Sequence, residues 1–220
     1  MGSRKIGVWL VGAWGGVATT VVTGLLALRR GMSDTTGLVS TKPPFSELDL
    51  VGWDDLVIGG HEIRETSYAV EARQLHEQSH VFPEVWLTTL GDEFQAIDQR
   101  IQPGTLHGVG PTIEGLAGSK ALSHRGESAG QAVTRLARDI EQFRTRNDLA
   151  TVIVVNVSST EPPVDDAVKR LSLAEIQQQL DTNAACPLPA STLYALAAFR
   201  CRCPYVNFTP SMGTDLPALD

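Results

Sequence analysis

Short apolar runs alternate with stretches of helical periodicity along this chain. Residues 5–11 are β-branched and bulky, which is typical of a strand buried on both faces. Gly12 begins a turn. From Val17 a small, aliphatic pattern continues to Arg29, a cation that suits the C-terminus of a helix before a stop at Gly31. The pattern therefore predicts a strand, a glycine turn and a helix.

The same order recurs in the next part of the chain. Residues 54–60 form a brief apolar run that ends in paired glycines, and a helical pattern follows over 65–78. Residues 32–53 carry no sustained period and predict a connection with one short helix near 45–50. Residues 85–90 fit either a strand or a turn of helix.

The clearest patterns lie in the second half of the chain. Residues 102–128, rich in Gly, Ser and His, show no period and predict a loop. Over 130–146 the apolar residues recur at spacings of 3, 4 and 3 with charges between them, which predicts an amphipathic helix. Residues 151–157 predict a strand that two prolines end.

Two further helices and a last strand complete the pattern. Ser172 and Glu175 have the spacing of a capping box, so we expect a helix of about ten residues to begin there. Another helix is predicted over 191–200 and a short strand over 205–208. Because strands and helices alternate, the chain is expected to belong to the α/β class, with a mostly parallel sheet and helices on both faces.

Composition and charge exclude several classes of protein. A chain of 220 residues with 42% hydrophobic and 20% charged residues can bury a sizeable core, and we expect one domain over 1–220. With 18 basic and 25 acidic residues, the net charge of −7 provides no positive field for a polyanion, so no nucleic-acid partner is expected. Three cysteines cannot all pair, which favours a reducing, cytoplasmic setting.

A run of 23 uncharged residues, 6–28, is long enough to span a bilayer. Five glycines interrupt the run, and its apolar residues fall into two blocks on either side of residues 13–16. We therefore expect a strand and a helix here rather than a membrane anchor or a cleaved signal peptide.

The glycine turn is the first candidate site. Backbone amides at a helix N-terminus can hold a pyrophosphate, and only small residues let it approach. The order Gly12-Ala-Trp14-Gly15-Gly16-Val17 departs from G-x-G-x-x-G, because its third place is Trp14. By itself the turn fits a nucleotide site or a plain tight turn, and its place between strand and helix favours the nucleotide site.

A dinucleotide site also needs a carboxylate near the end of the second strand to accept from the adenine ribose. Glu62 stands at such a strand end, although it lies far beyond the customary distance of about twenty residues from the glycine turn. A solvated acid at a helix start explains Glu62 on spacing almost as well.

Polar residues follow the strand at 151–157. Ligands gather at the carboxyl ends of strands in open α/β sheets, which makes Ser158, Ser159 and Thr160 candidates together with the preceding Asn156. Asn207 occupies the same place after the last strand. An ordinary turn, in which these side chains satisfy backbone groups, explains the pattern equally well.

No metal site is predicted. Cys201-x-Cys203, with Cys186 fifteen residues earlier, lacks the usual ligand number and spacing, which favours buried thiols. His76 and His80 are one helical turn apart without an evident third ligand, which favours a solvated helix face.

Three stretches in this order resemble the NAD-dependent inositol-3-phosphate synthases (myo-inositol-1-phosphate synthases). Residues 10–20, LVGAWGGVATT, are similar to the family's glycine-rich first turn. Residues 152–161, VIVVNVSSTE, are similar to its strand with a polar turn, and residues 204–211, PYVNFTPS, to its Asn-containing strand end. Residues 59–63, GGHEI, also resemble its glycine-then-acid segment. The resemblance covers nearly the whole chain and implies a Rossmann-like NAD-binding domain that is incomplete relative to the family.

The resemblance also implies a reaction. Such an enzyme oxidises glucose 6-phosphate at C5 with bound NAD, enolises the ketone, closes the ring by an intramolecular aldol step and reduces the product, as a cytoplasmic homo-oligomer serving inositol and phospholipid biosynthesis. By matched position, three groups of residues are expected to bind NAD. The pyrophosphate group is Gly12, Trp14, Gly15, Gly16 and Val17; the adenine ribose acceptor is Glu62; the nicotinamide group is Ser158, Ser159, Thr160 and Asn207.

The sequence departs from the family in one respect. It ends at Asp220, before the family's Gly-Asp/Arg-Asp-x-Lys-Ser/Thr-Gly motif and the lysines that neutralise phosphate and enolate charge. None of its four lysines stands in such a motif, so the catalytic residues are unassigned and we expect the 220-residue chain alone to be inactive. Two alternatives stay open: a catalytically silent NAD-binding or regulatory module, and another NAD(P)-linked dehydrogenase.

Overall fold

A computed structural model describes residues 5–181 and 186–219 of the chain. Its centre is a five-stranded sheet with the order β3-β2-β1-β4-β5, in which every neighbouring pair is parallel. The strands are β1 (Ile6–Val11), β2 (Leu56–Glu62), β3 (Ile101–Pro103), β4 (Thr151–Asn156) and β5 (Tyr205–Asn207). The expected parallel α/β sheet is thus confirmed. The domain predicted over 1–220 extends beyond the described residues at 1–4, 182–185 and 220.

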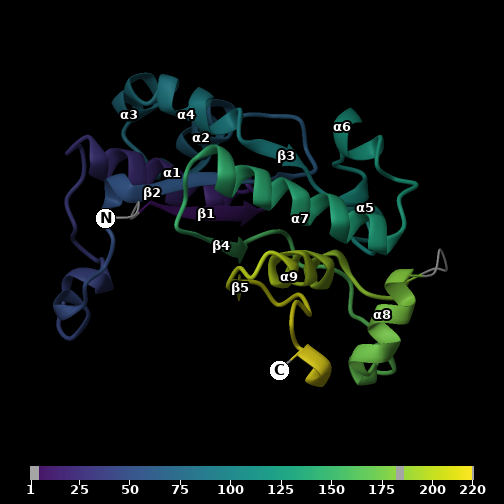
Figure 1. Ribbon diagram of the computed structural model, residues 1–220. Helices are drawn as coiled ribbons and strands as arrows, with labels where there is room; N and C mark the ends of the chain where they lie inside the picture. The colour runs from purple at the N-terminus through teal and green to yellow at the C-terminus, as the bar shows by residue number, and fades with distance from the viewer. Residues whose placement is uncertain (1–4, 182–185, 220) are drawn as a thin grey trace.

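Helices cover both faces of the sheet (Figure 1). They are α1 (Gly16–Arg29), α2 (Tyr68–Ser79), α3 (Glu84–Thr89), α4 (Gly91–Asp98), α5 (Pro111–Glu114), α6 (Ser119–Leu122), α7 (Ala129–Arg146), α8 (Leu173–Asp181) and α9 (Ala190–Arg200). Since successive strand side chains point to opposite faces, Leu10 packs with α1, α2 and α4, whereas Trp9 and Val11 pack with α7 and α9. Both faces of β1 are therefore buried.

The uncharged run 6–28 is divided between β1 and α1, as the sequence predicted. None of the helices in the described part of the chain has the length and apolar character that crossing a bilayer requires.

The connection from α1 to β2 extends away from the sheet (Figure 1). It contains three single turns of 3₁₀ helix, η1 (Val39–Thr41), η2 (Phe45–Glu47) and η3 (Trp53–Asp55). The short helix predicted near 45–50 is the turn η2. Residues 41–50 are all exposed, so no tertiary packing extends this turn into a longer helix.

The segments left open by the sequence contain regular structure. Residues 85–89 belong to the helix α3, which Leu90 follows as the C-cap, and the region 102–128 contains part of β3 together with α5 and α6 rather than only loop. A strand of three residues and helices of four are too short to show a period. Long-range contacts are present instead: Arg135 donates to the carbonyls of Pro103 and Gly104 at the end of β3, and Glu65 accepts from the hydroxyl of Ser119 and the amide of Lys120 in α6.

The predicted capping box is present. Ser172 accepts from the amide of Glu175, whose carboxylate accepts from the amide of Ser172, which confirms the capping box before α8. Ser128 and Gln131 form a second capping box at the start of α7, the helix predicted over 130–146. Side chains at these positions satisfy amides that a helix start leaves unpaired.

Two further η turns complete the chain path, η4 (Val168–Arg170) before α8 and η5 (Pro217–Leu219) after β5.

Candidate functional site

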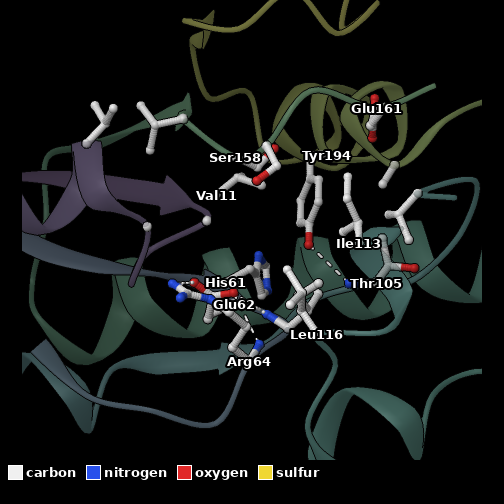
Figure 2. A pocket seen from close by; sticks show the side chains of 18 of the residues that line it. Val11, His61, Glu62, Arg64, Thr105, Ile113, Leu116, Ser158, Glu161 and Tyr194 are labelled. Atoms are coloured by element: carbon white, nitrogen blue, oxygen red, sulfur yellow. Dashed lines mark hydrogen bonds and ion pairs between the residues drawn. The ribbon is translucent and has the colours of Figure 1, made fainter. Parts of the chain in front are cut away.

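A cavity of about 420 Å³ lies at the carboxyl ends of the strands, where ligands bind in open α/β sheets. Figure 2 shows its walls. They come from the glycine turn after β1, the end of β2, the turn after β4, the start of α9 and the segment 105–116. The walls include seven of the ten residues predicted for NAD: Gly12, Gly15, Gly16, Val17, Glu62, Ser158 and Ser159.

The glycine turn has a backbone that requires glycine at its first position. Gly12 has a φ of +80°, and a Cβ added there would stand 2.7 Å from the Cα of Ser158. The amide of Gly12 donates to the carbonyl of His61, and the amide of Gly15 donates to the carbonyl of Gly12. The first bond joins the turn to β2, the second closes the turn, and the absence of a side chain on Gly12 allows its close contact with Ser158.

The start of α1 presents unpaired amides to the cavity. The first bond along the helix runs from the amide of Thr19 to the carbonyl of Gly15, so the amides of Gly16, Val17 and Ala18 have no partner within the helix. No described side chain caps Gly15, and the first turn contains no acidic residue. Gly16 and Val17 are exposed and line the cavity. This end can therefore hold an anion.

Glu62 ends β2 beside the glycine turn. One carboxylate oxygen accepts from the amides of Ile63 and Arg64, at 2.8 and 3.2 Å. The other accepts from the amide of Trp14 at 2.9 Å and from Nη2 of Arg64 at 3.3 Å. The long α1–β2 connection explains why Glu62 stands so far from the glycine turn in sequence although the two are in contact.

Arg64 bridges two carboxylates at the same end of β2. Its Nη2 lies 3.3 Å from Glu62, and its Nη1 lies 3.2 Å from Oε2 of Glu71 on α2. Burial by itself lowers the pKa of Arg64, but the charges and hydrogen bonds of Glu62 and Glu71 outweigh it and raise the pKa. Arg64 was not identified from the sequence, because only the fold brings Glu71 beside it.

Trp14 lies in the turn but outside the lining of this cavity. Its amide donates to Glu62, and its indole Nε1 donates to Asp98 at 2.7 Å. It lines a second cavity, of about 240 Å³, next to the end of β3. Both donors that Trp14 could offer to a pyrophosphate thus already have partners, and its contact with a cofactor stays a prediction.

Two asparagines join the ends of β4 and β5. Asn156 is fully buried, donates to Oδ1 of Asn207 at 3.0 Å, and accepts from the amide and the hydroxyl of Ser158. Asn207 donates in turn to the carbonyl of Ser211. This network fixes Ser158 against the glycine turn, while Asn207 and the exposed Thr160 lie outside the lining of the cavity.

His61 is a wall residue for which the sequence offered no role. It is fully buried on β2, and its Nδ1 accepts from the indole of Trp9 at 2.8 Å. The proton is therefore on Nε2, which faces Oδ2 of Asp139 at 3.4 Å. Burial lowers the pKa of His61, so the ring is neutral, and Trp9 sets its tautomer.

Glu161 is a second residue that sequence reasoning missed. Its carboxylate is buried at the start of α9, where it accepts from the amide and the hydroxyl of Ser191. Burial raises the pKa of Glu161, and the hydrogen bonds from Ser191 oppose that shift. The carboxylate caps α9 from a distant part of the chain and lines the cavity. Its sequence neighbours, two prolines and a threonine, gave no sign of this contact.

Tyr194 closes the cavity on the side of α9. Figure 2 shows its ring extending from α9 toward the end of β2. Its hydroxyl accepts from the amide of Thr105 at 3.0 Å, which ties α9 to the segment after β3.

The cysteines and histidines outside the cavity form no metal centre. Within residues 5–181 and 186–219, no three His, Cys, Asp or Glu side chains are placed to hold an ion. All three cysteines are free, buried thiols, as the sequence predicted. His76 and His80 are in ring contact at 5.3 Å, and His76 bonds the carbonyl of Phe82.

Comparison with known proteins gives one consistent family. A profile for NAD-binding regions described as myo-inositol-1-phosphate synthase matches residues 6–220. Inositol-3-phosphate synthase 1 of Bacteroides thetaiotaomicron is 29% identical over 227 residues, which cover 98% of this chain and 50% of that protein. The chain thus spans about half the length of this curated relative.

Two solved structures share the fold. The inositol-3-phosphate synthase of Caenorhabditis elegans superposes with a TM-score of 0.83 at 19% identity, over 99% of this chain and 46% of that one. A myo-inositol-1-phosphate synthase-related protein of Thermotoga maritima gives 0.61 at 19% identity, over 98% of this chain and 50% of that one. With the profile matching almost the entire sequence, the chain belongs to the myo-inositol-1-phosphate synthase family.

Proposed function

We propose that this chain is the NAD-binding part of an inositol-3-phosphate synthase, an isomerase that converts glucose 6-phosphate to inositol 3-phosphate. Family membership supports the reaction, and one structural observation carries the cofactor assignment. The uncapped start of α1 presents free amides to a cavity, and Gly12, with its positive φ, lets the turn before that helix pack closely against Ser158 in the cavity wall. This arrangement is the usual one for a pyrophosphate.

The residues present fit a dinucleotide. A Cβ at Gly12 would fill the space where the turn and Ser158 meet, and the cavity volume of about 420 Å³ lies within the usual range for ligand sites. The carboxylate of Glu62 stands at the end of β2, where an adenine ribose lies in such folds. The chemistry that NAD supplies when bound is reversible hydride transfer, so oxidation and later reduction of the sugar leave a net isomerisation.

The chain's own residues then have defined tasks. The amides of Gly16 and Val17 bind the pyrophosphate, and Glu62 accepts from the ribose hydroxyls. Ser158, held by Asn156, orients the nicotinamide half at the end of β4. Tyr194 and the segment after β3 exclude water from the inner wall.

A charge placed at the start of α1 tests the cofactor assignment. Val17 is exposed in the first turn and lines the cavity, whereas Val21 is exposed one turn later and lies outside the lining. Val17→Glu places an anion where the pyrophosphate binds, yet an acid in the first turn favours the helix by about 0.3–1 kcal/mol. Val21→Glu adds the same charge away from the site.

Titration calorimetry with NAD⁺ gives the readout. We expect Val17→Glu to lose at least tenfold in NAD⁺ affinity without loss of thermal stability, and Val21→Glu to bind within about twofold of the wild-type chain. Equal affinity of Val17→Glu and the wild-type chain contradicts the assignment.

A further inference from the structure

The end of β2 determines which nucleotide the cavity accepts, because the adenine ribose of a bound dinucleotide meets the protein there. Glu62 and Arg64 both stand at this end and both line the cavity. The following inference rests on the proposed function and concerns the 2′ position of that ribose, which is a hydroxyl in NAD and a phosphate in NADP.

Glu62 has no spare acceptor position. An ionised carboxylate offers about four lone-pair sites, and four donors of this chain occupy those of Glu62. Three of the donors are backbone amides fixed by the fold. The fourth, Nη2 of Arg64, makes the longest contact, at 3.3 Å, and belongs to a side chain that can move. A ribose hydroxyl that binds Glu62 therefore replaces the guanidinium.

Arg64 keeps a second partner when it leaves Glu62. Its Nη1 is 3.2 Å from Glu71, so the cation stays paired on α2 while the ribose takes its place. The exchange breaks the ion pair between Arg64 and the buried carboxylate of Glu62, and Glu71 continues to neutralise the cation. Binding of a 2′-hydroxyl thus requires no unpaired charge.

A 2′-phosphate meets a different situation. An arginine beside the ribose accommodates this phosphate in NADP-dependent proteins, since its planar fork fits phosphate oxygens. Here each terminal nitrogen of that arginine already faces a carboxylate, which neutralises its charge, and the carboxylate of Glu62 stands at the end of β2 where the phosphate has to lie. Repulsion from Glu62 and the neutralisation of Arg64 both disfavour binding of a 2′-phosphate.

We propose that Arg64 is the specificity-determining residue for the 2′ position, a phosphate-binding cation that Glu62 and Glu71 keep out of use. The chain then selects NAD because its arginine is neutralised, and removal of either carboxylate releases a site for the 2′-phosphate.

Calorimetric titrations with NAD⁺ and NADP⁺ test this, because the two ligands differ only in that phosphate. The variants are Glu62→Gln, Arg64→Gln, their combination, and Glu71→Gln. We expect Glu62→Gln to improve the affinity for NADP⁺ relative to NAD⁺ by about tenfold to a hundredfold, the range of one charge-assisted hydrogen bond. The combined variant loses this gain, since the cation is gone.

Glu71→Gln keeps the test valid if Glu62→Gln disturbs the glycine turn. It frees Nη1 of Arg64 from its ion pair while leaving the bonds of Glu62 in place, and we expect a several-fold gain in NADP⁺ affinity. Arg73→Gln is the matched control, because it removes a cation of the same kind from an exposed position on α2. Its ratio of NAD⁺ to NADP⁺ affinity should equal that of the wild-type chain.

The outcomes separate this inference from the proposed function. Binding of NAD⁺ by the wild-type chain without any gain of NADP⁺ affinity in Glu62→Gln or Glu71→Gln overturns the inference alone. A gain that persists after Arg64→Gln also overturns it, because the phosphate then uses another cation. Failure of the folded wild-type chain to bind either nucleotide refutes the proposed function itself.

Discussion

Replacement of Gly12 by alanine is the sharpest single test of the glycine turn. The residue has a φ of +80°, a conformation that costs any residue with a Cβ about 1–2 kcal/mol. The added Cβ also meets the Cα of Ser158 at 2.7 Å and its Cβ at 3.0 Å. The Cα belongs to a backbone whose amide Asn156 holds in place, so it cannot simply rotate away.

Such overpacking adds about 1–3 kcal/mol. Together the two effects predict that Gly12→Ala lowers the free energy of unfolding by about 2–5 kcal/mol, a large part of the roughly 5–15 kcal/mol typical of a domain. Displacement of the turn from Ser158 also predicts weaker NAD⁺ binding. Urea unfolding followed by circular dichroism gives the first quantity and calorimetry gives the second.

Gly24→Ala is the matched control. Gly24 lies inside α1, and a Cβ added there has nothing within 4 Å. Alanine is the better helix former, so this variant should be more stable than the wild-type chain by about 0.5–1 kcal/mol, with unchanged NAD⁺ affinity. If Gly12→Ala is as stable as Gly24→Ala and binds NAD⁺ equally well, the reasoning about the turn is refuted.

Three further substitutions test the network around the cavity. Burial raises the pKa of Glu161, so the wild-type chain loses stability as pH rises from the usual glutamate value of about 4.3 through the raised value. Glu161→Gln should remove this pH-dependent loss of stability. If the unfolding free energies of the two proteins, measured in urea, change in parallel with pH, the raised pKa of Glu161 is contradicted. Asn156→Ala removes the hydrogen bond between the ends of β4 and β5 and should lower the free energy of unfolding by about 1–3 kcal/mol in the same measurement. Unchanged stability would show that this bond does not stabilise the fold. Trp9→Phe leaves Nδ1 of His61 without its donor and should cost about 1–3 kcal/mol, whereas a fully stable variant shows that the bond contributes nothing.

The buried strands and the long amphipathic helices could be predicted from the sequence, because their patterns reflect burial directly. The strand at 151–157 and the helix at 130–146 appear as β4 and α7, each within a residue at its ends. Strand β3 and helices α5 and α6 are too short to show a period, and long-range contacts such as those of Arg135 with Pro103 in β3 and of Glu65 with Ser119 in α6 accompany them. These contacts depend on the fold and leave no local period.

The candidate site shows the same division. The glycine turn is visible in the sequence because a strand, small residues and a helix follow one another. The hydrogen bond between Glu62 and the turn could not be predicted, because the long α1–β2 connection separates the two in sequence. His61 and Glu161 are assigned only by their partners, the indole of Trp9 and the start of α9, and neither partner lies near them in the chain.

A crystal structure of the chain with NAD⁺ tests the central claim most directly. We expect the pyrophosphate against the amides of Gly16 and Val17, with an adenine ribose hydroxyl on the carboxylate of Glu62 and the guanidinium of Arg64 moved toward Glu71. NAD⁺ bound elsewhere, or absent from the cavity at millimolar concentration, would contradict it.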